Sequence, residues 1–191
     1  MVYVNEHTDL LDIESALKQV SAQRREQALR FRHESGQRLS LGVYLLLMEG
    51  LKKEYGITEA PVFDYTEEGK PFIASRPDIH FNFSHSGTVA MCAISDKPVG
   101  ADVETNRKIS SSLINYTMNE SEQEQINASP DPTMRFLYFW TRKEALLKLT
   151  GEGIRNNVKN VLAEAEKYCF ETVEKENYIY TIVKHKNIEI Q

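Results

Sequence analysis

Helical spacing dominates the first third of the chain. From about Ser35 to Tyr55, apolar residues recur every three or four positions, which is the period of one face of a helix. A lysine pair followed by Gly56 is typical of a helix end, so we expect a long amphipathic helix over this range. Two shorter helices are predicted upstream, over Asp12 to Val20 and Ser21 to Phe31, each with its first residue as N-cap.

Strand patterns follow in the middle of the chain. Ile79 to Phe83 alternates apolar and polar residues, Val89 to Ile94 is an apolar run, and Val99 to Glu104 follows a turn at Ser95 to Pro98. Turn residues between Pro61 and Ile73 indicate short strands before this region.

Helical spacing returns in the second half. Thr117 and Glu120 match a capping box that would open a short helix, and Pro130-Asp131-Pro132 would interrupt it. Thr133 is expected to cap a longer helix from Met134 to Thr150, which a glycine then closes.

The segment from Tyr168 to Ile190 alternates again and predicts two or three strands. The order of helix, strand, helix and strand regions favours an α+β protein with a mostly antiparallel sheet. Lys97-Pro98 is the natural seam, and it divides the 191 residues nearly in half.

Composition places the chain among ordinary globular proteins, with 41% hydrophobic and 27% charged residues. Two cysteines, Cys92 and Cys169, cannot build a disulfide framework, which fits a reducing compartment. The longest nearly apolar run, Leu41 to Met48, is far below the ~18 residues that suggest a membrane span, and the first residues do not resemble a secretory signal. We therefore expect a cytoplasmic protein that does not act at a membrane.

The net charge of −5 argues against a protein that wraps nucleic acid, so no nucleic-acid partner is expected. A local excess of bases nevertheless lies between Lys18 and Arg38, which include six basic side chains and only two acidic ones. This excess would suit a compact phosphorylated ligand. Charge counting alone favours the alternative, a solvated helix face with ion pairs between residues four positions apart.

Asp102 and Glu104 are the first candidates for chemistry. Alternate residues of a strand point to the same side, roughly 7 Å apart along the backbone. Neighbouring carboxylates repel each other unless a cation lies between them, and a hard divalent ion such as Mg²⁺ would accept their oxygens while keeping positions open for phosphates. An isolated Asp-x-Glu more often lies on an exposed strand face, so this motif alone does not establish a metal site.

Glu144 and Lys148 are the second candidates, on the helix expected from Met134 to Thr150. They share one face of that helix with Leu137 and Trp140. Charged side chains beside an aromatic and aliphatic stripe indicate a partly buried polar site. The alternative is a surface ion pair that contributes a few tenths of a kcal/mol, and the helix by itself favours neither interpretation.

The segment from Phe81 to Gly87 is the third candidate, a strand that we expect to run into a polar turn. Its hydroxyls, imidazole and turn amides would form a cradle for an anion. Ser84 and His85 point apart in an extended chain, so we do not expect a hydrolase triad, and a lone histidine at a strand end is more often structural. The chain has no P-loop, dinucleotide-binding or zinc-binding motif.

Taken in order, these three segments resemble the Sfp-type (surfactin-synthetase-activating) 4'-phosphopantetheinyl transferases. The matching pieces are FNFSHSG at 81–87, PVGADVE at 98–104 and FWTRKEALLKLTGEGI at 139–154, with weaker agreement at Gly69-Lys70-Pro71 and around Phe31 to Arg38. Each piece alone is modest, but the ordered set is specific, and it outweighs the solvent-face interpretation of Asp-x-Glu and the structural interpretation of the histidine.

The resemblance implies the 4'-phosphopantetheinyl transferase fold, a pseudo-dimer of two similar α+β halves with the active site in the cleft between them. Residues 1–98 would form the N-terminal half that binds the phosphates of coenzyme A. Residues 99–191 would form the C-terminal half with the metal ligands and the catalytic helix. The family transfers the 4'-phosphopantetheine arm of coenzyme A to a serine of an acyl or peptidyl carrier protein and releases adenosine 3',5'-bisphosphate.

The resemblance also implies roles for residues of the second half. Asp102, Glu104 and Glu144 would hold Mg²⁺, with Mn²⁺ as the alternative ion, against the pyrophosphate of coenzyme A. Lys148 would bind coenzyme A and stabilise charge on the phosphate under attack. Glu144 is the first candidate for activating the carrier serine, directly or through water, and Glu120 is the second.

In the first half, the resemblance implies that His85 and Ser84 bind the 3'-phosphate of coenzyme A. Lys70 and Arg38 match cationic positions near the nucleotide phosphates. The expected partners are coenzyme A as substrate and a carrier protein of fatty-acid, polyketide or nonribosomal-peptide biosynthesis, and the fused halves imply a monomer.

Two other classes of function stay open on the residues alone. A metal-dependent phosphodiesterase or nuclease would also combine acidic pairs with a lysine, although the net charge argues against it. A non-catalytic module that binds coenzyme A would keep the basic segment and His85 without turnover.

Overall fold

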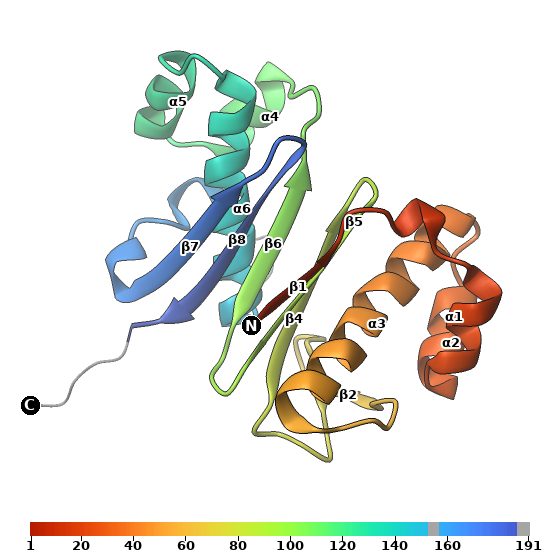
Figure 1. Cartoon of the computed structure of the whole chain (residues 1–191). Coiled ribbons are helices and arrows are strands. Elements are labelled where there is room, and N and C mark those ends of the chain that lie inside the picture. The colour runs from red at the N-terminus through yellow and green to blue at the C-terminus, as the bar shows by residue number, and fades with distance from the viewer. Residues whose placement is uncertain (153–156, 187–191) are drawn as a thin grey trace, which may run out of the picture. The chain divides into compact units, whose positions relative to one another are not determined.

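Two units make up the fold, which we describe from a computed structural model that covers residues 1–152 and 157–186 (Figure 1). The units are Met1–Lys97 and Pro98–Gln191, and each combines helices with antiparallel strands. This arrangement confirms the predicted α+β class and the antiparallel sheets. Within the described ranges, no helix is long and apolar enough to cross a bilayer.

The first unit packs three helices beside a three-stranded sheet. Its strands are β1 (Val2–Asn5), β2 (Phe63–Tyr65), β3 (Pro71–Ile73), β4 (His80–Ser86) and β5 (Val89–Ser95). Its helices are α1 (Ile13–Gln19), α2 (Ala22–Leu29), α3 (Glu34–Tyr55) and the 3-10 helix η1 (Thr8–Leu10). The sheet has the order β1-β5-β4, while β2 and β3 form a separate hairpin.

The predicted N-caps and the glycine stop of the first unit are confirmed, whereas α2 ends at Leu29, before the predicted Phe31. The side chain of Asp12 accepts a hydrogen bond from the amide of Glu14, and that of Ser21 accepts one from the amide of Arg24, so both are N-caps. Gly56 ends α3 in the left-handed conformation, with a φ of 68° that favours glycine.

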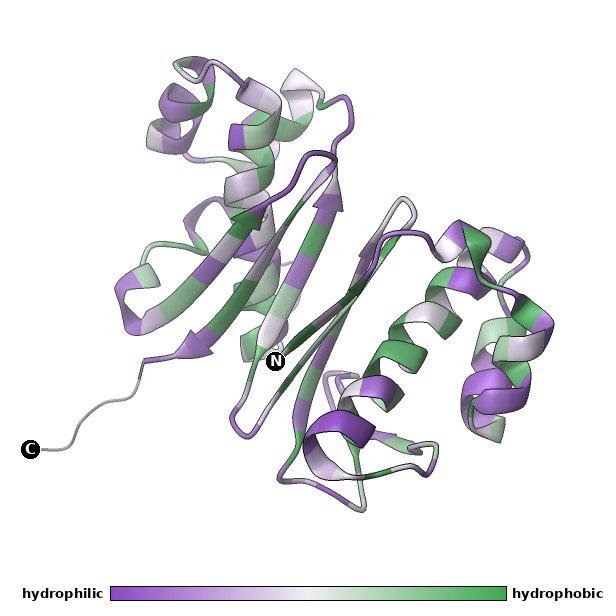
Figure 2. Cartoon of the chain, viewed as in Figure 1, coloured by the Kyte–Doolittle hydropathy of each residue, from purple (hydrophilic) through white to green (hydrophobic). Residues whose placement is uncertain are grey.

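The core of the first unit lies between α3 and the sheet. Buried aliphatic and aromatic residues from both sides form one cluster, including Leu41, Leu47, Phe63, Phe81 and Ile94. Figure 2 shows hydrophobic residues in the middle of α3 and hydrophilic ones at its C-terminal end. The amphipathic pattern therefore places α3 on the sheet, as its period of apolar residues indicates.

The second unit packs one long helix across a three-stranded sheet. Its strands are β6 (Gly100–Thr105), β7 (Tyr168–Glu174) and β8 (Tyr178–His185), in the order β6-β8-β7. Its helices are α4 (Ser111–Thr117), α5 (Glu120–Asn127), α6 (Pro132–Thr150) and the 3-10 helices η2 (Val158–Asn160) and η3 (Ala165–Lys167). The predicted tail strands are β7 and β8, and residues 187–190 of that prediction lie outside the described part of the chain.

The predicted capping box at the start of α5 is wrong. Asn119 caps α5 and exchanges hydrogen bonds with Glu122, whereas Thr117 is the last residue of α4 and its hydroxyl donates to the carbonyl of Leu113. Thr117-x-x-Glu120 and Asn119-x-x-Glu122 both fit the capping pattern. The helix α4, which the sequence did not predict, continues through Thr117 and leaves only the second pair at a helix start.

The predicted cap of α6 is also wrong by two residues. Asp131 accepts a hydrogen bond from the amide of Met134, and Pro132 is the first helical residue, so Thr133 lies inside the helix. Proline fits the first position of a helix because its missing N–H has no intrahelical partner there.

Candidate active site

Asp102 and Glu104 both reach the helix α6 from strand β6. Oδ1 of Asp102 accepts a hydrogen bond from Nζ of Lys148 over 2.7 Å, and Oε1 of Glu104 accepts one from the indole Nε1 of Trp140 over 3.1 Å. The Asp102 residue is only 4% exposed, so its carboxylate is largely withdrawn from water, whereas the side chain of Lys148 is partly exposed. The two carboxylates therefore lie on one side of β6, the side that α6 covers.

Glu144 lies between these two contacts along α6. Trp140, Glu144 and Lys148 are four positions apart and form one stripe of the helix. Because Trp140 binds Glu104 and Lys148 binds Asp102, the stripe places Glu144 beside both carboxylates. The structure thus brings together four predicted site residues of this unit.

Gly100 lets strand and helix approach closely at this level. A Cβ atom at Gly100 would lie 2.0 Å from the carbonyl oxygen of Ala145 and 2.8 Å from the amide nitrogen of Leu149. No side chain fits in that space, so the backbones of β6 and α6 meet directly.

Glu144 has an unusual electrostatic environment. Its Oε1 is buried and has no hydrogen-bond partner among the residues that the structure describes. Burial is the main cause that raises the pKa of Glu144 to about 7; the charges of Asp102 and Glu104 act in the same direction, while Lys148 opposes the shift. Glu144 is therefore balanced between its acid and its carboxylate form near neutral pH.

The donor set fits a hard divalent cation. Three carboxylates, one with a buried oxygen that lacks a hydrogen bond, are the oxygen ligands that Mg²⁺ prefers. In the arrangement that the described ranges adopt, no three Asp, Glu, His or Cys side chains are grouped closely enough to hold a metal ion. Lys148 instead binds Asp102, and Arg107 Nε lies 3.6 Å from Glu104 Oε2, so cation binding requires these side chains to exchange partners.

Glu120, the second candidate base, makes none of the described polar contacts with this group. It is exposed on the first turn of α5, and none of the described hydrogen bonds or ion pairs joins it to Asp102, Glu104, Glu144 or Lys148.

The sequence did not single out Lys143 and Glu122, which form a buried ion pair in the same unit. The capping pattern Asn119-x-x-Glu122 could have drawn attention to Glu122, but no local signal shows that Lys143 reaches it.

Ser84 and His85 lie near the end of strand β4 in the first unit. The strand continues through Ser86, so the polar turn begins at Gly87, later than the sequence predicted. Ser84 is buried and His85 is exposed, because adjacent strand residues point to opposite faces. The structure therefore gives the two predicted phosphate ligands different surroundings.

Lys70 and Arg38 are the remaining predicted phosphate ligands. Lys70 follows the turn at Gly69 between β2 and β3, and partial burial lowers its pKa. Arg38 lies on α3, where Nε donates to the carbonyl of Leu11 over 3.1 Å and the guanidinium is 2.9 Å from Glu34.

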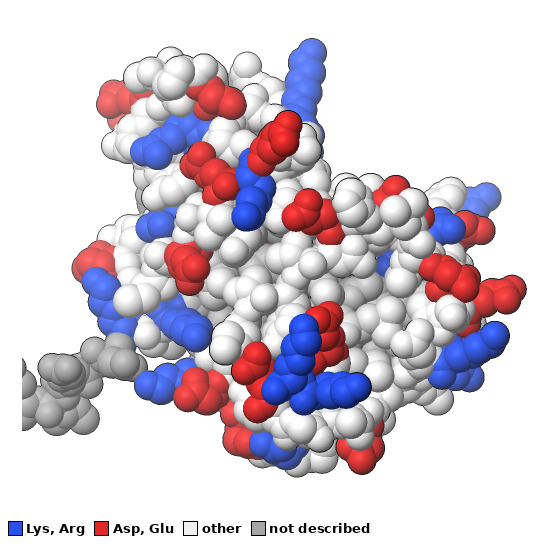
Figure 3. All heavy atoms as spheres, viewed as in Figure 1, with Lys and Arg blue, Asp and Glu red and all other residues white. Residues whose placement is uncertain are grey.

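The basic segment from Lys18 to Arg38 is partly engaged in structural contacts. Arg30 pairs with Glu26 at 2.8 Å, Arg25 donates to a backbone carbonyl, and Arg24 lies over aromatic rings. On the face of the molecule in Figure 3, basic and acidic side chains are interspersed. Part of the charge excess thus belongs to the solvated helix face that charge counting favoured.

Comparison with protein families gives two matches, one for each unit. Residues 9–97 match the family described as "4'-phosphopantetheinyl transferase, N-terminal". Residues 98–186 match the "4'-phosphopantetheinyl transferase superfamily".

Curated relatives agree with these matches. A 4'-phosphopantetheinyl transferase of Bacillus subtilis is 32% identical over 156 residues, which are 80% of this chain and 70% of the relative. The 4'-phosphopantetheinyl transferase Sfp of Bacillus subtilis (strain 168) is 28% identical over the same shares. The 4'-phosphopantetheinyl transferase psf-1 of Bacillus pumilus is 31% identical over 163 residues, again 80% of this chain and 70% of the relative. Since both units match and the similarity extends over most of either chain, this protein belongs to the Sfp-type 4'-phosphopantetheinyl transferases.

Proposed function

We propose that this protein transfers the 4'-phosphopantetheine arm of coenzyme A to a serine of an acyl or peptidyl carrier protein in a Mg²⁺-dependent reaction. The serine oxygen forms a bond to the phosphorus of the arm, the pyrophosphate P–O bond breaks, and adenosine 3',5'-bisphosphate leaves. Membership of the family and the carboxylates of β6 and α6 support this proposal.

Asp102, Glu104 and Glu144 are the residues that would hold Mg²⁺. When bound, the ion would neutralise and orient the pyrophosphate oxygens. The support from this structure is the shared side of Asp102 and Glu104 and the buried, unbonded Oε1 of Glu144.

Lys148 would stabilise the negative charge that develops on the phosphate under attack. Its ammonium already lies beside the carboxylate group of the site, and about 30% of its side chain is exposed, so an incoming ligand can reach it. A fixed cation aimed at a developing charge is a common means of lowering a barrier.

Glu144 would accept the proton of the carrier serine, directly or through water. Burial raises the pKa of Glu144 to about 7, near the value at which a general base works best at neutral pH. Glu120 stays the second candidate, and its exposed position on α5 leaves it open to solvent.

The first unit would bind the phosphates of coenzyme A. His85 and Ser84 are proposed for the 3'-phosphate, and Lys70 and Arg38 for the nucleotide phosphates. Partial burial of Lys70 supports this role, because a poorly hydrated ammonium gains more from a phosphate than a fully hydrated one does.

Intact-mass measurement tests the proposal directly. Apo carrier proteins of the three biosynthetic types are incubated with coenzyme A, Mg²⁺ and the chain, and at least one should gain the mass of one phosphopantetheine group. Glu144→Gln should abolish the gain in the same carrier. If no carrier in such a panel gains mass with the unaltered chain, the proposed function is wrong.

A further inference from the structure

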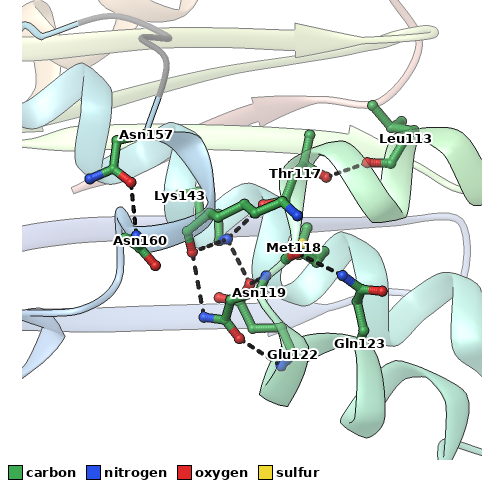
Figure 4. Close-up of polar contacts among 10 residues, drawn as sticks. Leu113, Thr117, Met118, Asn119, Glu122, Gln123, Lys143, Asn157 and Asn160 are labelled. Atoms are coloured by element: carbon green, nitrogen blue, oxygen red, sulfur yellow. Dashed lines mark hydrogen bonds and ion pairs between the residues drawn. The ribbon is translucent and has the colours of Figure 1, made fainter.

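Lys143 is a fully buried lysine on the catalytic helix α6. Its side chain has 0% exposure, and its Nζ donates to Oε2 of Glu122 over 2.6 Å, to the carbonyl of Thr117 over 2.8 Å and to the carbonyl of Lys159 over 3.1 Å. Figure 4 shows the ammonium of Lys143 at the centre of these contacts. All three donors of the ammonium are therefore used.

The three acceptors come from three different segments. Thr117 ends α4, Glu122 lies in the first turn of α5, and Lys159 belongs to η2. Oε2 of Glu122 also accepts the amide of Asn119 over 2.9 Å, so the capping box of α5 is tied to the same ammonium. Lys143 thus links α4, α5 and η2 to α6 by hydrogen bonds.

A gain in folding stability does not by itself explain why Lys143 and Glu122 form a buried ion pair. Removing two charges from water costs several kcal/mol, and a well-packed apolar pair of similar volume is often as stable. A buried lysine with three fixed acceptors instead restrains the orientation of its helix, because each hydrogen bond limits how the helix can rotate or slide.

Glu144 is the next residue along α6, and its own side chain supplies little restraint. Oε1 of Glu144 has no hydrogen-bond partner in the described part of the chain, so its place depends on the backbone. The position of the helix is held by the two residues that flank Glu144. Lys143 makes the hydrogen bonds described above, and the backbone of Ala145 packs closely against Gly100.

We propose that Lys143 is a positioning residue for Glu144. Its three hydrogen bonds, two of them fully buried, fix the rotation of α6 at the turn where the helix meets β6, and this sets where the Glu144 carboxylate points. Small displacements of a catalytic group lower rates strongly, so the effect should be visible in turnover. The role in turnover rests on the proposed transferase function, whereas the geometric effect on α6 does not.

The test uses the double variant Lys143→Met/Glu122→Gln, which removes both charges and nearly keeps the volume. Lys143→Met alone would leave the buried Glu122 carboxylate unpaired and is not expected to fold well. The matched control is Thr141→Val, which removes a different buried contact on α6, the 2.9 Å hydrogen bond between the hydroxyls of Thr141 and Thr181.

Two readouts separate a positioning role from a purely structural one. The first is steady-state transfer, in which kcat of the folded double variant should fall about tenfold while KM for coenzyme A stays within about twofold. The second is the fluorescence of Trp140, the single tryptophan. Trp140 lies one helical turn before Glu144 on α6, and its indole donates a hydrogen bond to Glu104. Its acrylamide quenching should increase in the double variant and stay unchanged in Thr141→Val.

The outcomes are distinct. A double variant with unchanged kcat and unchanged Trp140 quenching overturns the positioning role, as does a control that changes both readouts equally. If the unaltered chain transfers nothing, the proposed function fails, and the Trp140 quenching still decides whether Lys143 fixes the geometry of α6.

Discussion

Nζ of Lys148 lies 2.7 Å from Oδ1 of Asp102, so an ammonium from α6 neutralises the most deeply buried carboxylate of the site. Under the proposed function, the same ammonium serves a phosphate and the same carboxylate serves a metal ion. Both ligands must therefore break this ion pair when they bind. The pair links the affinity of the site for a cation to the affinity for coenzyme A.

Replacing Lys148 with methionine should tighten cation binding and abolish transfer. The ammonium competes with a divalent ion for Asp102, and removing it should raise the affinity for Mn²⁺ at least about tenfold in the absence of coenzyme A. Titration followed by electron paramagnetic resonance measures this affinity.

The control for that measurement is Lys167→Met, which removes one positive charge from the same unit at an exposed pair with Glu164. Its Mn²⁺ affinity should change less than about twofold, because exposed charges are screened. An unchanged or weaker affinity in Lys148→Met would show that the ammonium does not compete with the ion.

Glu144 should make the protein less stable as the pH rises. Its pKa is raised to about 7 in the folded chain, above the ordinary carboxyl value, so the folded state holds the proton more tightly than the unfolded state. The resulting stabilisation is fully present below the ordinary value and is lost as the pH rises through about 7.

Glu144→Gln removes this dependence. Urea unfolding without divalent ions should show the variant on the order of 1 kcal/mol more stable than the unaltered chain at about pH 8, and close to it at about pH 5. Glu120→Gln, at an exposed position, is the control and should follow the unaltered chain at both values. Parallel curves for Glu144→Gln and the unaltered chain would mean that Glu144 is not buried as described.

The sequence predicts most of the fold because the long elements carry strong periodic patterns. The helices α3 and α6 and the strands β5 and β6 appear close to the expected positions. Short elements are harder to predict, because they contain too few residues to show a periodic pattern. β1 has four residues and forms by pairing with β5, a partner far along the chain, so its own pattern is too brief to reveal it.

The candidate site likewise contains residues that local spacing predicts and residues that it does not. Strand and helix spacing alone place Asp102 with Glu104 and Glu144 with Lys148 on common faces, and the structure brings these faces together. The pair of Lys143 and Glu122 is different, since the two residues are 21 positions apart and meet only through the packing of α5 on α6. Contacts of this kind follow from tertiary structure rather than from local periodicity.

His85→Gln should weaken the binding of coenzyme A and leave turnover nearly intact. An exposed imidazole at the end of β4 would donate a charge-assisted hydrogen bond to the 3'-phosphate, and its loss should raise KM for coenzyme A by about tenfold. The comparison with 3'-dephospho-coenzyme A sharpens this test, because the unaltered chain and His85→Gln should use that substrate equally well.

The control for His85→Gln is His7→Gln, an exposed histidine of the same unit whose loss should leave KM unchanged. If His85→Gln discriminates between the two substrates as well as the unaltered chain does, His85 does not bind the 3'-phosphate.

Gly100→Ala should damage both stability and transfer, because the added methyl group would lie 2.0 Å from the carbonyl oxygen of Ala145. Backbone atoms of α6 cannot yield as a flexible side chain can, so the helix must move away from β6, at a cost of about 2 kcal/mol or more. Thermal unfolding and the mass-based transfer assay measure the two effects. Gly42→Ala is the matched control, since its methyl would meet the Cγ2 atom of Thr8 at 3.1 Å and needs only a small adjustment. Equal losses in the two variants would show that direct contact between β6 and α6 is not what holds Glu144 beside Asp102 and Glu104.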